Sequence, residues 1–270
     1  AAAELTGPTF SKVMPKITNS ARTLYVFYTA FTALETLILM LCGLDWFDAL
    51  THSFSTIGTG GFSNYNDSIS HFNSASVEWV ITVFMFLAGI NFNLYYLGIF
   101  HHPKEVLQDA ELRLYAIITA VSASAVALYL FLSGSFDSLG EAVRCSLFQC
   151  VSVLTTTGYC TTDFDLWPSF PKTVLFLLMF VGGCSSSTGG GIKVIRILVL
   201  FKLIRRGVLV RLHPNAITKI KLKDKVLSID TVQSIAGFFF LYLLLLAAAA
   251  LLIAAGGHDM ATAVTAAASS

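Results

Sequence analysis

The sequence predicts an all-α integral membrane protein, and three observations carry that prediction. Of its 270 residues, 55% are hydrophobic and only 12% are charged, whereas about a quarter of the residues in a typical soluble domain are charged. The mean hydropathy is +0.73, and the apolar residues are gathered in runs of about 20, the length that crosses a bilayer as a helix. A short pattern rich in threonine and glycine occurs twice between these runs. A soluble enzyme is therefore disfavoured.

Five apolar stretches are long enough to span a membrane: residues 21–43, 79–100, 114–132, 173–200 and 231–255. Each can cross about 30 Å of hydrocarbon as a helix that rises about 1.5 Å per residue. The fourth stretch differs from the others because its centre reads GGCSSSTGGG. Non-helical backbone at membrane depth is tolerated only where it is buried in protein or lines a water-filled cavity. We therefore expect an interrupted helix there.

The charges between the stretches predict the orientation in the membrane. Lys and Arg precede the first stretch, lie between the second and third, and number eight within residues 202–225, so the positive-inside rule places these segments in the cytoplasm. The remaining connections carry eight acidic residues against two basic ones and face outside. An acidic mouth concentrates cations. The net charge of +1 gives no reason to expect a nucleic-acid partner.

A half-helix followed by a Thr/Gly turn is predicted twice. Apolar residues at helical spacing in two short segments precede FSTIGTGGFSNYND at residues 54–67 and VSVLTTTGYCTTDF at residues 151–164. A shift of 97 residues places Thr59 on Thr156 and Gly61 on Gly158. The repeated unit is a helix, a re-entrant half-helix, a turn and a second helix, and residues 231–270 resemble the start of a third copy.

Such a turn suits the coordination of a dehydrated cation. Backbone carbonyls arranged in a ring can replace the water shell of potassium, glycine reaches backbone angles that other residues avoid, and threonine adds a hydroxyl oxygen. Two glycine-rich surface turns are the alternative interpretation. Recurrence after matching half-helices weakens it.

The motifs STIGTGGFS, LTTTGYCTTDFDLWP and FVGGCSSSTGGGIK resemble the Trk/Ktr/HKT superfamily of potassium transporters, and most closely its bacterial TrkH-type membrane subunits. The resemblance implies four repeats around one potassium-channel-like pore, one filter glycine per repeat, and a homodimer in the bacterial inner membrane. It also implies control by a cytoplasmic nucleotide-binding, TrkA-like regulatory subunit. Potassium is then the transported ion, membrane lipid surrounds the protein, and no organic cofactor is expected.

By motif match, the resemblance makes Gly61 and Gly158 the filter glycines. The implied potassium filter comprises Ile57, Gly58, Thr59, Gly60, Gly61, Leu154, Thr155, Thr156, Thr157 and Gly158. An intramembrane gating loop is implied beneath it, comprising Gly182, Gly183, Cys184, Ser185, Ser186, Ser187, Thr188, Gly189, Gly190 and Gly191. Small residues for helix packing are the alternative for this loop, whereas a nucleotide-binding loop is disfavoured because no GxxxxGK[ST] or GxGxxG pattern follows a strand.

The predicted organisation has five parts. A cytoplasmic or interfacial lead-in (1–20) is followed by a pore repeat (21–102), a second repeat with the interrupted helix (103–205), a basic cytoplasmic connector (206–229) and a truncated further repeat (230–270). By the resemblance, the two full repeats are the second and third of four, so we expect a piece of a longer subunit. The basic segment 202–225 fits anionic lipid or a docked regulatory subunit, and its pieces VLVRL and ITKIKLK alternate as short strands do.

Two rival functions remain. A two-repeat channel subunit could dimerise to complete the pore. An intramembrane serine hydrolase could use a serine of residues 185–187, but none of the six histidines lies inside an apolar stretch where it could act as a base. We therefore expect no enzyme. Glu35 within the first stretch has either a functional or a hydrogen-bonding role, Asn91 is expected to hydrogen-bond between helices, and the five cysteines are expected to be mostly buried free thiols.

Overall fold

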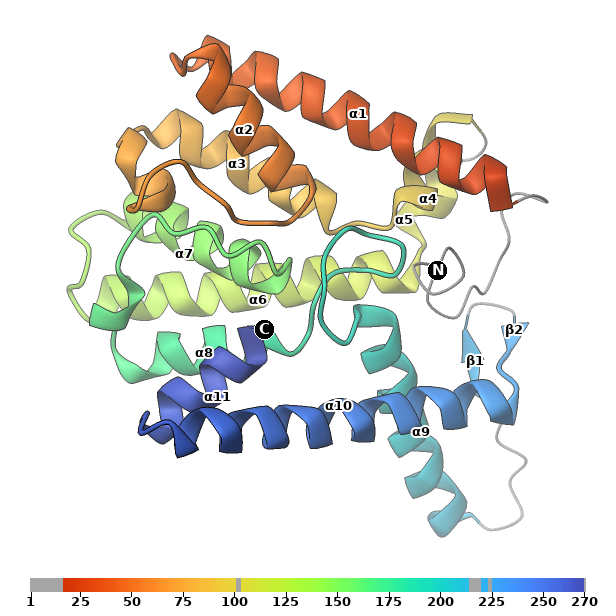
Figure 1. The fold of residues 1–270 in the computed structure, drawn as a ribbon. Coiled ribbons are helices and arrows are strands. Elements are labelled where there is room, and N and C mark those ends of the chain that lie inside the picture. The colour runs from red at the N-terminus through yellow and green to blue at the C-terminus, as the bar shows by residue number, and fades with distance from the viewer. Residues whose placement is uncertain (1–16, 101–102, 214–219, 223–224, 270) are drawn as a thin grey trace. The chain divides into compact units, whose positions relative to one another are not determined.

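The computed structural model describes residues 17–100, 103–213, 220–222 and 225–269. The chain divides into two compact units, Ala1–Gly191 and Ile192–Ser270, which are described separately. The first unit contains α1 (Ile17–Leu41), α2 (Trp46–Ile57), η1 (Ser68–Phe72), α3 (Ala75–Ala88), α4 (Phe92–Phe100), α5 (Pro103–Leu107), α6 (Ala110–Leu132), α7 (Leu139–Leu154), η2 (Phe164–Leu166) and α8 (Ser169–Met179) (Figure 1).

Two short helices, α2 and α7, each follow a long apolar helix and pack against it. Helix α2 lies on α1 and α7 lies on α6, while α3 contacts both α2 and α7 (Figure 1). Each short helix begins at a polar N-cap: the Asp45 carboxylate accepts a hydrogen bond from the Asp48 N–H, and the Ser138 hydroxyl accepts one from the Glu141 N–H, both at 3.4 Å. The two predicted half-helices are therefore present as separate helices.

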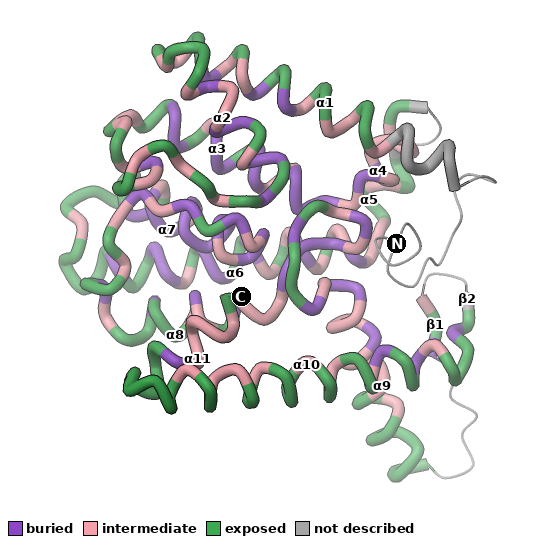
Figure 2. Tube along the Cα trace, viewed as in Figure 1, coloured by how far each residue is buried: buried purple, intermediate pink, exposed green. Residues whose placement is uncertain are grey.

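Within the described residues, three helices are long and apolar enough to cross a membrane, namely Leu24–Leu41, Ala110–Leu132 and Ile229–Ala255. Apolar side chains on α1 and α10 are largely exposed, as a lipid-facing surface requires (Figure 2). Helix α6 exposes part of its apolar surface and buries the rest, including Val126, Ala127 and Leu130. Helices α3 and α4 pass the same test as a pair, but they are bent by 90°. The all-α membrane fold is thus as the composition predicts.

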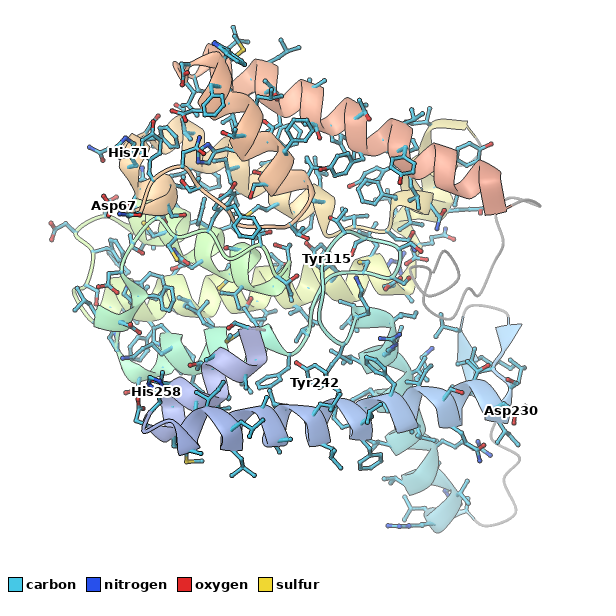
Figure 3. All side chains as sticks on the ribbon, viewed as in Figure 1. Asp67, His71, Tyr115, Asp230, Tyr242 and His258 are labelled. Carbon is cyan, nitrogen blue, oxygen red and sulfur yellow. The ribbon has the colours of Figure 1, made fainter. Side chains whose placement is uncertain are left out.

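The continuous helix expected over residues 79–100 is wrong, because the chain bends between Ala88 and Phe92. A Cβ added at Gly89 would overlap the hydroxyl of Tyr115, a residue labelled in Figure 3. The Asn91 side chain accepts a hydrogen bond from the Asn93 N–H at 3.0 Å and so starts a new helix. Close approach at a glycine and a local cap together break the helix.

The core of this unit lies between the short helices and α3. Its fully buried members come from α1, α2, η1, α3 and α7, together with one residue of the second Thr/Gly turn: Leu39, Ala49, Ile69, Val77, Ile81, Met85, Phe148, Val151 and Tyr159. Because Tyr159 belongs to the turn itself, the core fixes that turn directly. The five cysteines are free thiols, and three of them, Cys145, Cys150 and Cys184, are buried.

The second unit contains α9 (Val194–Leu212), a two-stranded antiparallel ribbon of β1 (Lys221–Leu222) and β2 (Lys225–Val226), α10 (Ile229–Ala255) and α11 (Met260–Ser269). The Arg196 guanidinium lies 3.9 Å from the centre of the Phe238 ring and joins α9 to α10. The strand expected at VLVRL is wrong, since these residues continue α9; five alternating residues do not outweigh a helix that is already formed. Within ITKIKLK, residues 217–219 and 223 lie outside the described residues.

Candidate cation filter and adjoining loop

The first Thr/Gly turn folds back onto the end of α2. Three N–H groups donate to carbonyls of its last turn: Gly58 to Phe54 (3.0 Å), Thr59 to Thr56 (3.0 Å) and Gly60 to Ser55 (2.7 Å). Thr59 and Gly61 then take left-handed backbone angles, with φ of 50° and 68°. A β-branched residue is uncommon in that region, so the turn is strongly imposed by its surroundings.

The second turn repeats this backbone 97 residues later. Its three hydrogen bonds are Thr155 to Val151 (2.9 Å), Thr156 to Val153 (3.1 Å) and Thr157 to Ser152 (2.9 Å). Thr156 and Gly158 are again left-handed, with φ of 59° and 88°. These three donors and acceptors match their counterparts in the first turn, although several side chains differ. The Gly158 N–H adds a further bond to the Ser152 carbonyl at 3.3 Å.

A serine braces each turn from the preceding helix. Ser55 Oγ accepts a hydrogen bond from the Phe62 N–H at 2.7 Å, and Ser152 Oγ donates one to the Tyr159 carbonyl at 2.7 Å. The Tyr159 hydroxyl also donates to the Phe62 carbonyl at 3.2 Å and to the His52 carbonyl at 3.3 Å. The second turn is thus tied to the first.

The two glycines that the sequence predicts to line a filter have different surroundings. A Cβ added at Gly61 would overlap the Thr157 carbonyl oxygen, so the two turns touch there. At Gly158 no atom lies within 4 Å of an added Cβ. Gly61 is therefore required by space and backbone angle, and Gly158 by backbone angle alone.

A pocket of about 610 Å³ opens beside both glycines. Most of the residues that line it carry a hydroxyl, amide or carboxylate group. The lining residues are Gly61, Ser63, Tyr65, Asn66, Asp67, Ser68, Ser70, Gly158, Cys160, Thr161, Thr162, Asp163 and Phe164. Asp67 and Asp163 come from segments after the first and second turn, and Figure 3 shows Asp67 near His71 at one end of the unit. Two carboxylates among neutral oxygens favour cations over anions.

Asp48 adds a further carboxylate at the start of α2. The Tyr65 hydroxyl donates to its Oδ2 at 2.6 Å and the Asn64 amide donates to its Oδ1 at 3.0 Å. Partial burial raises the pKa of Asp48, but these hydrogen bonds together outweigh burial and hold the pKa below the usual aspartate value. The hydrogen bond that Tyr65 donates to Asp48 also raises the pKa of Tyr65. The carboxylate is therefore ionised at neutral pH.

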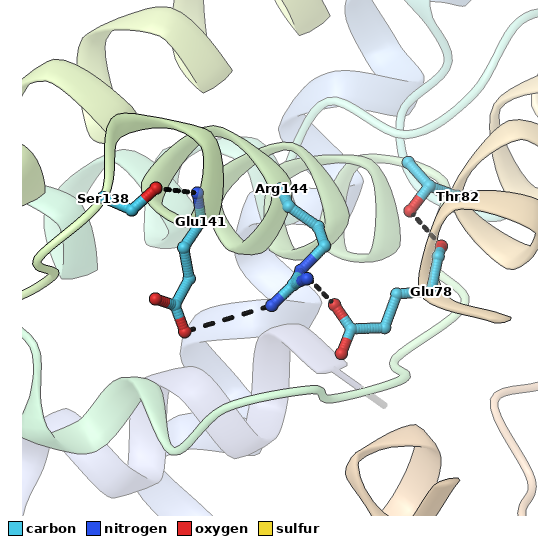
Figure 4. Close-up of polar contacts among 5 residues, drawn as sticks. All are labelled: Glu78, Thr82, Ser138, Glu141 and Arg144. Atoms are coloured by element: carbon cyan, nitrogen blue, oxygen red, sulfur yellow. Dashed lines mark hydrogen bonds and ion pairs between the residues drawn. The ribbon is translucent and has the colours of Figure 1, made fainter. Parts of the chain in front are cut away.

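An ion pair joins α3 and α7 at the ends where these helices begin. Arg144 Nε lies 2.9 Å from Glu78 Oε2, and Arg144 Nη2 lies 3.9 Å from Glu141 Oε1 (Figure 4). Thr82 Oγ1 donates to the Glu78 carbonyl at 2.6 Å. The pair is half-buried, and it fixes the start of the half-helix that leads to Gly158.

The segment 182–191, here called the GGC loop, lies against the second turn. The Gly190 N–H donates to Thr156 Oγ1 at 2.6 Å, and the Cys184 N–H donates to the Gly89 carbonyl at 2.8 Å. Thr188 Oγ1 donates to the Ala88 carbonyl at 3.3 Å. The structure therefore brings the sequence-predicted gate into direct contact with a sequence-predicted filter residue.

Sequence reasoning missed one residue at this loop, the buried Glu111 of α6. Its carboxylate accepts hydrogen bonds from the N–H and the hydroxyl of Ser185. A glutamate in the first turn of a helix is common, and its partner lies 74 residues away, so no local signal marks it. Asn91 was expected to bond between helices, but its amide donates to Ser185 Oγ of the GGC loop at 3.3 Å.

Spanning helices combined with two half-helices that end in matched Thr/Gly turns define a multi-pass, all-α membrane protein. Comparison with known proteins identifies the family. The model of the TrkH cation transport proteins matches residues 9–269, and the chain belongs to this family.

Relatives and a solved structure agree with this assignment. The Trk system potassium uptake protein TrkH of Halomonas elongata is 36% identical over 87% of this chain and 49% of its own length. Its counterpart from Escherichia coli strain K12 is 36% identical over 88% and 50%. The crystal structure of the potassium transporter TrkH from Vibrio parahaemolyticus matches with a TM-score of 0.91 at 35% identity, over 99% of this chain and 58% of that one. The chain thus spans about half the length of the curated relatives it matches.

Proposed function

We propose that this chain is part of the ion-translocating membrane subunit of a potassium uptake system. The observation that carries the proposal is the pair of matched turns, which touch each other at Gly61 and share one acidic pocket. The relatives named above are potassium uptake proteins. Their names agree with the chemistry that the turns favour.

In the proposed mechanism, cations gather at the carboxylates of the pocket and lose water at the two turns. Carbonyl and hydroxyl oxygens of residues 57–61 and 154–158 replace that water, which suits potassium. Two turns supply half of a four-part ring. We assign the other half to further turns of the same kind, for which a polypeptide of the relatives' length has room.

The GGC loop is the proposed gate. It bonds to Thr156, to the last residue of α3 and to the first turn of α6. In the proposed path, the loop lies beyond the two turns from the carboxylates of the pocket. Its glycines permit a second backbone path. Ser185 bonds a carboxylate and not a histidine, which supports transport over serine hydrolysis.

The test of the filter uses Gly158→Ser and Gly61→Ala in the intact protein, reconstituted in vesicles. We expect a lower ratio of potassium to sodium flux in both variants, because an added Cβ at a left-handed position redirects the adjoining carbonyls. The matched control is Gly134→Ala, which also lies at a left-handed angle (φ 70°) with no atom within 4 Å of an added Cβ. An unchanged flux ratio in both filter variants would refute the proposal.

The proposed partners are a second copy of the subunit and a cytoplasmic nucleotide-binding protein at the basic segment, with the inner membrane as the location. Arg205, Arg206 and Arg211 lie on α9 within the second unit. Exposed ion pairs contribute about 0–1 kcal/mol each, so single changes should be mild. Reversing all three charges should reduce capture of the regulatory protein in neutral detergent, most strongly at low salt. Undiminished capture would leave these cations with a role in topology or lipid attraction.

A further inference from the structure

A buried carboxylate stands at the beginning of α6. Helix α6 starts at Asp109, whose side chain accepts hydrogen bonds from the Glu111 and Leu112 N–H groups, each at 3.0 Å. This cap fixes the first turn and therefore the position of Glu111, which is only 5% exposed. The positive end of the helix dipole stabilises a negative charge at that position. The Glu111 side chain is thus buried and held in a fixed position by the start of the helix.

Both oxygens of this carboxylate bond to one residue of the GGC loop. The Ser185 N–H donates to Oε1 at 2.5 Å, and the Ser185 hydroxyl donates to Oε2 at 2.7 Å. Hydrogen bonds to a charged acceptor are roughly twice as strong as those between neutral groups. The loop's ties to Gly89, Thr156 and Ala88 are of the neutral kind. The hydrogen bonds to the Glu111 carboxylate are therefore the strongest of these contacts that hold the GGC loop.

We propose that Glu111 is a positioning residue that latches the GGC loop in its closed place through Ser185. This inference rests on the proposed function, in which the loop blocks the path. The loop cannot leave without breaking two charge-assisted bonds and exposing the carboxylate to water. Weakening the latch should raise the open-to-closed ratio about 10-fold or more, the factor that one hydrogen bond to a charged group contributes.

The variants are Glu111→Gln, Ser185→Ala and the double variant, each in the intact natural protein. Glu111→Gln keeps the side-chain shape and removes the charge, so it separates the latch from simple packing. Ser185→Ala removes one of the two donors and leaves Glu111 in place. The matched control is Glu105→Gln on α5, an exposed carboxylate close in sequence.

Two measurements are made on protein reconstituted in vesicles without any regulatory partner. The first is rubidium flux, which reports the open state. The second is the rate at which a thiol reagent modifies Cys184, a fully buried thiol of the GGC loop, with each cysteine resolved by peptide mass spectrometry. Cys145, 2% exposed on α7, is the internal control for general loosening of the fold.

We expect faster Cys184 modification and higher flux in Glu111→Gln, an unchanged Cys145 rate, and an unchanged flux ratio of rubidium to sodium. Ser185→Ala should give a smaller effect than Glu111→Gln. The effect of the double variant should be smaller than the sum of the two single effects, because both changes act on one contact. No change at Cys184 in either single variant overturns the latch, and so does equal acceleration at both cysteines. Faster Cys184 modification without added flux keeps the latch and refutes the loop as the barrier.

Discussion

The two Thr/Gly turns have the same backbone conformation but differ in most of the side-chain contacts that hold it. Their three helix-closing hydrogen bonds correspond one to one. At the first turn, His52 of α2 bonds the Asp48 carbonyl at 2.8 Å and Ser63 Oγ at 2.9 Å. At the equivalent place in α7, Gln149 is fully buried, and its side-chain amide finds no hydrogen-bond partner among the described residues.

The supports differ at the other levels as well. The first turn is held by polar contacts within its own segment, including the bonds of Tyr65 and Asn64 to Asp48. The second is held by the burial of Tyr159, by the ion pair of Arg144 with Glu78, and by the GGC loop at Thr156. The backbone conformation that presents the carbonyl oxygens is therefore the same in both turns. Because their supporting contacts differ, the two turns should respond differently to substitution.

The largest expected difference lies between Gly61 and Gly158, the two glycines proposed to line the filter. Gly61→Ala forces a Cβ into the Thr157 carbonyl oxygen, and overpacking together with left-handed strain should cost about 3 kcal/mol or more. Gly158→Ala meets no atom and should cost about 1–2 kcal/mol. Thermal unfolding in detergent gives the ranking. Equal losses of stability in the two variants would show that the contact between the turns does not hold them together.

The ion pair of the second half-helix comes next. Glu78→Gln leaves Arg144 half-buried without its partner and should lower stability by about 1–3 kcal/mol. Replacing both residues by Met should lose less, because no unpaired charge is left. Glu141→Gln is the control, since that carboxylate is 3.9 Å from Arg144 and 47% exposed. A double replacement as harmful as the single one would mean that the pair itself is strongly stabilising.

A smaller effect is expected where the GGC loop meets only one of the two turns. Thr156→Val removes the acceptor of the Gly190 N–H, which should favour loop release by about 0.5–1.5 kcal/mol and raise flux in the absence of a regulator. Thr59→Val is the comparison, because Thr59 Oγ1 donates only to the neighbouring Gly58 carbonyl in the contacts described. Thr156→Ser should restore the low flux. Equal flux in the two valine variants would show that the contact between the GGC loop and Thr156 does not distinguish the two turns.

The sequence predicts those features that depend on local pattern. Apolar runs locate α1, α6 and α10, and helical spacing with Thr/Gly runs locates α2, α7 and their turns. The bend between α3 and α4 was missed because residues 79–100 are apolar on average, whereas the break depends on Tyr115 pressing against Gly89. Glu111 was missed for the same kind of reason. The role of Glu111 depends on its contact with Ser185, which is distant in sequence and cannot be predicted from residue spacing.

The smallest effect concerns acid tolerance of the first turn. The hydrogen bonds to Asp48 hold its pKa in the folded protein below the ordinary value, despite the opposing effect of partial burial. A carboxylate of this kind contributes stability above its unfolded pKa, and that contribution is lost as the pH falls through its folded pKa.

Tyr65→Phe removes the 2.6 Å bond and moves the folded pKa back toward the usual aspartate range. The variant should therefore be slightly less stable than the unchanged protein at pH 7, and its acid-unfolding midpoint should shift to slightly higher pH. The difference in stability should vanish once the pH falls below the folded pKa of Asp48. Tyr129→Phe, an exposed tyrosine of α6 outside this network, serves as the control. The position equivalent to Asp48 in the second repeat is Cys145, so α7 should show no matching acid sensitivity. A shift in Tyr129→Phe as large as that in Tyr65→Phe would mean that the Asp48 network does not set the acid tolerance of the first turn.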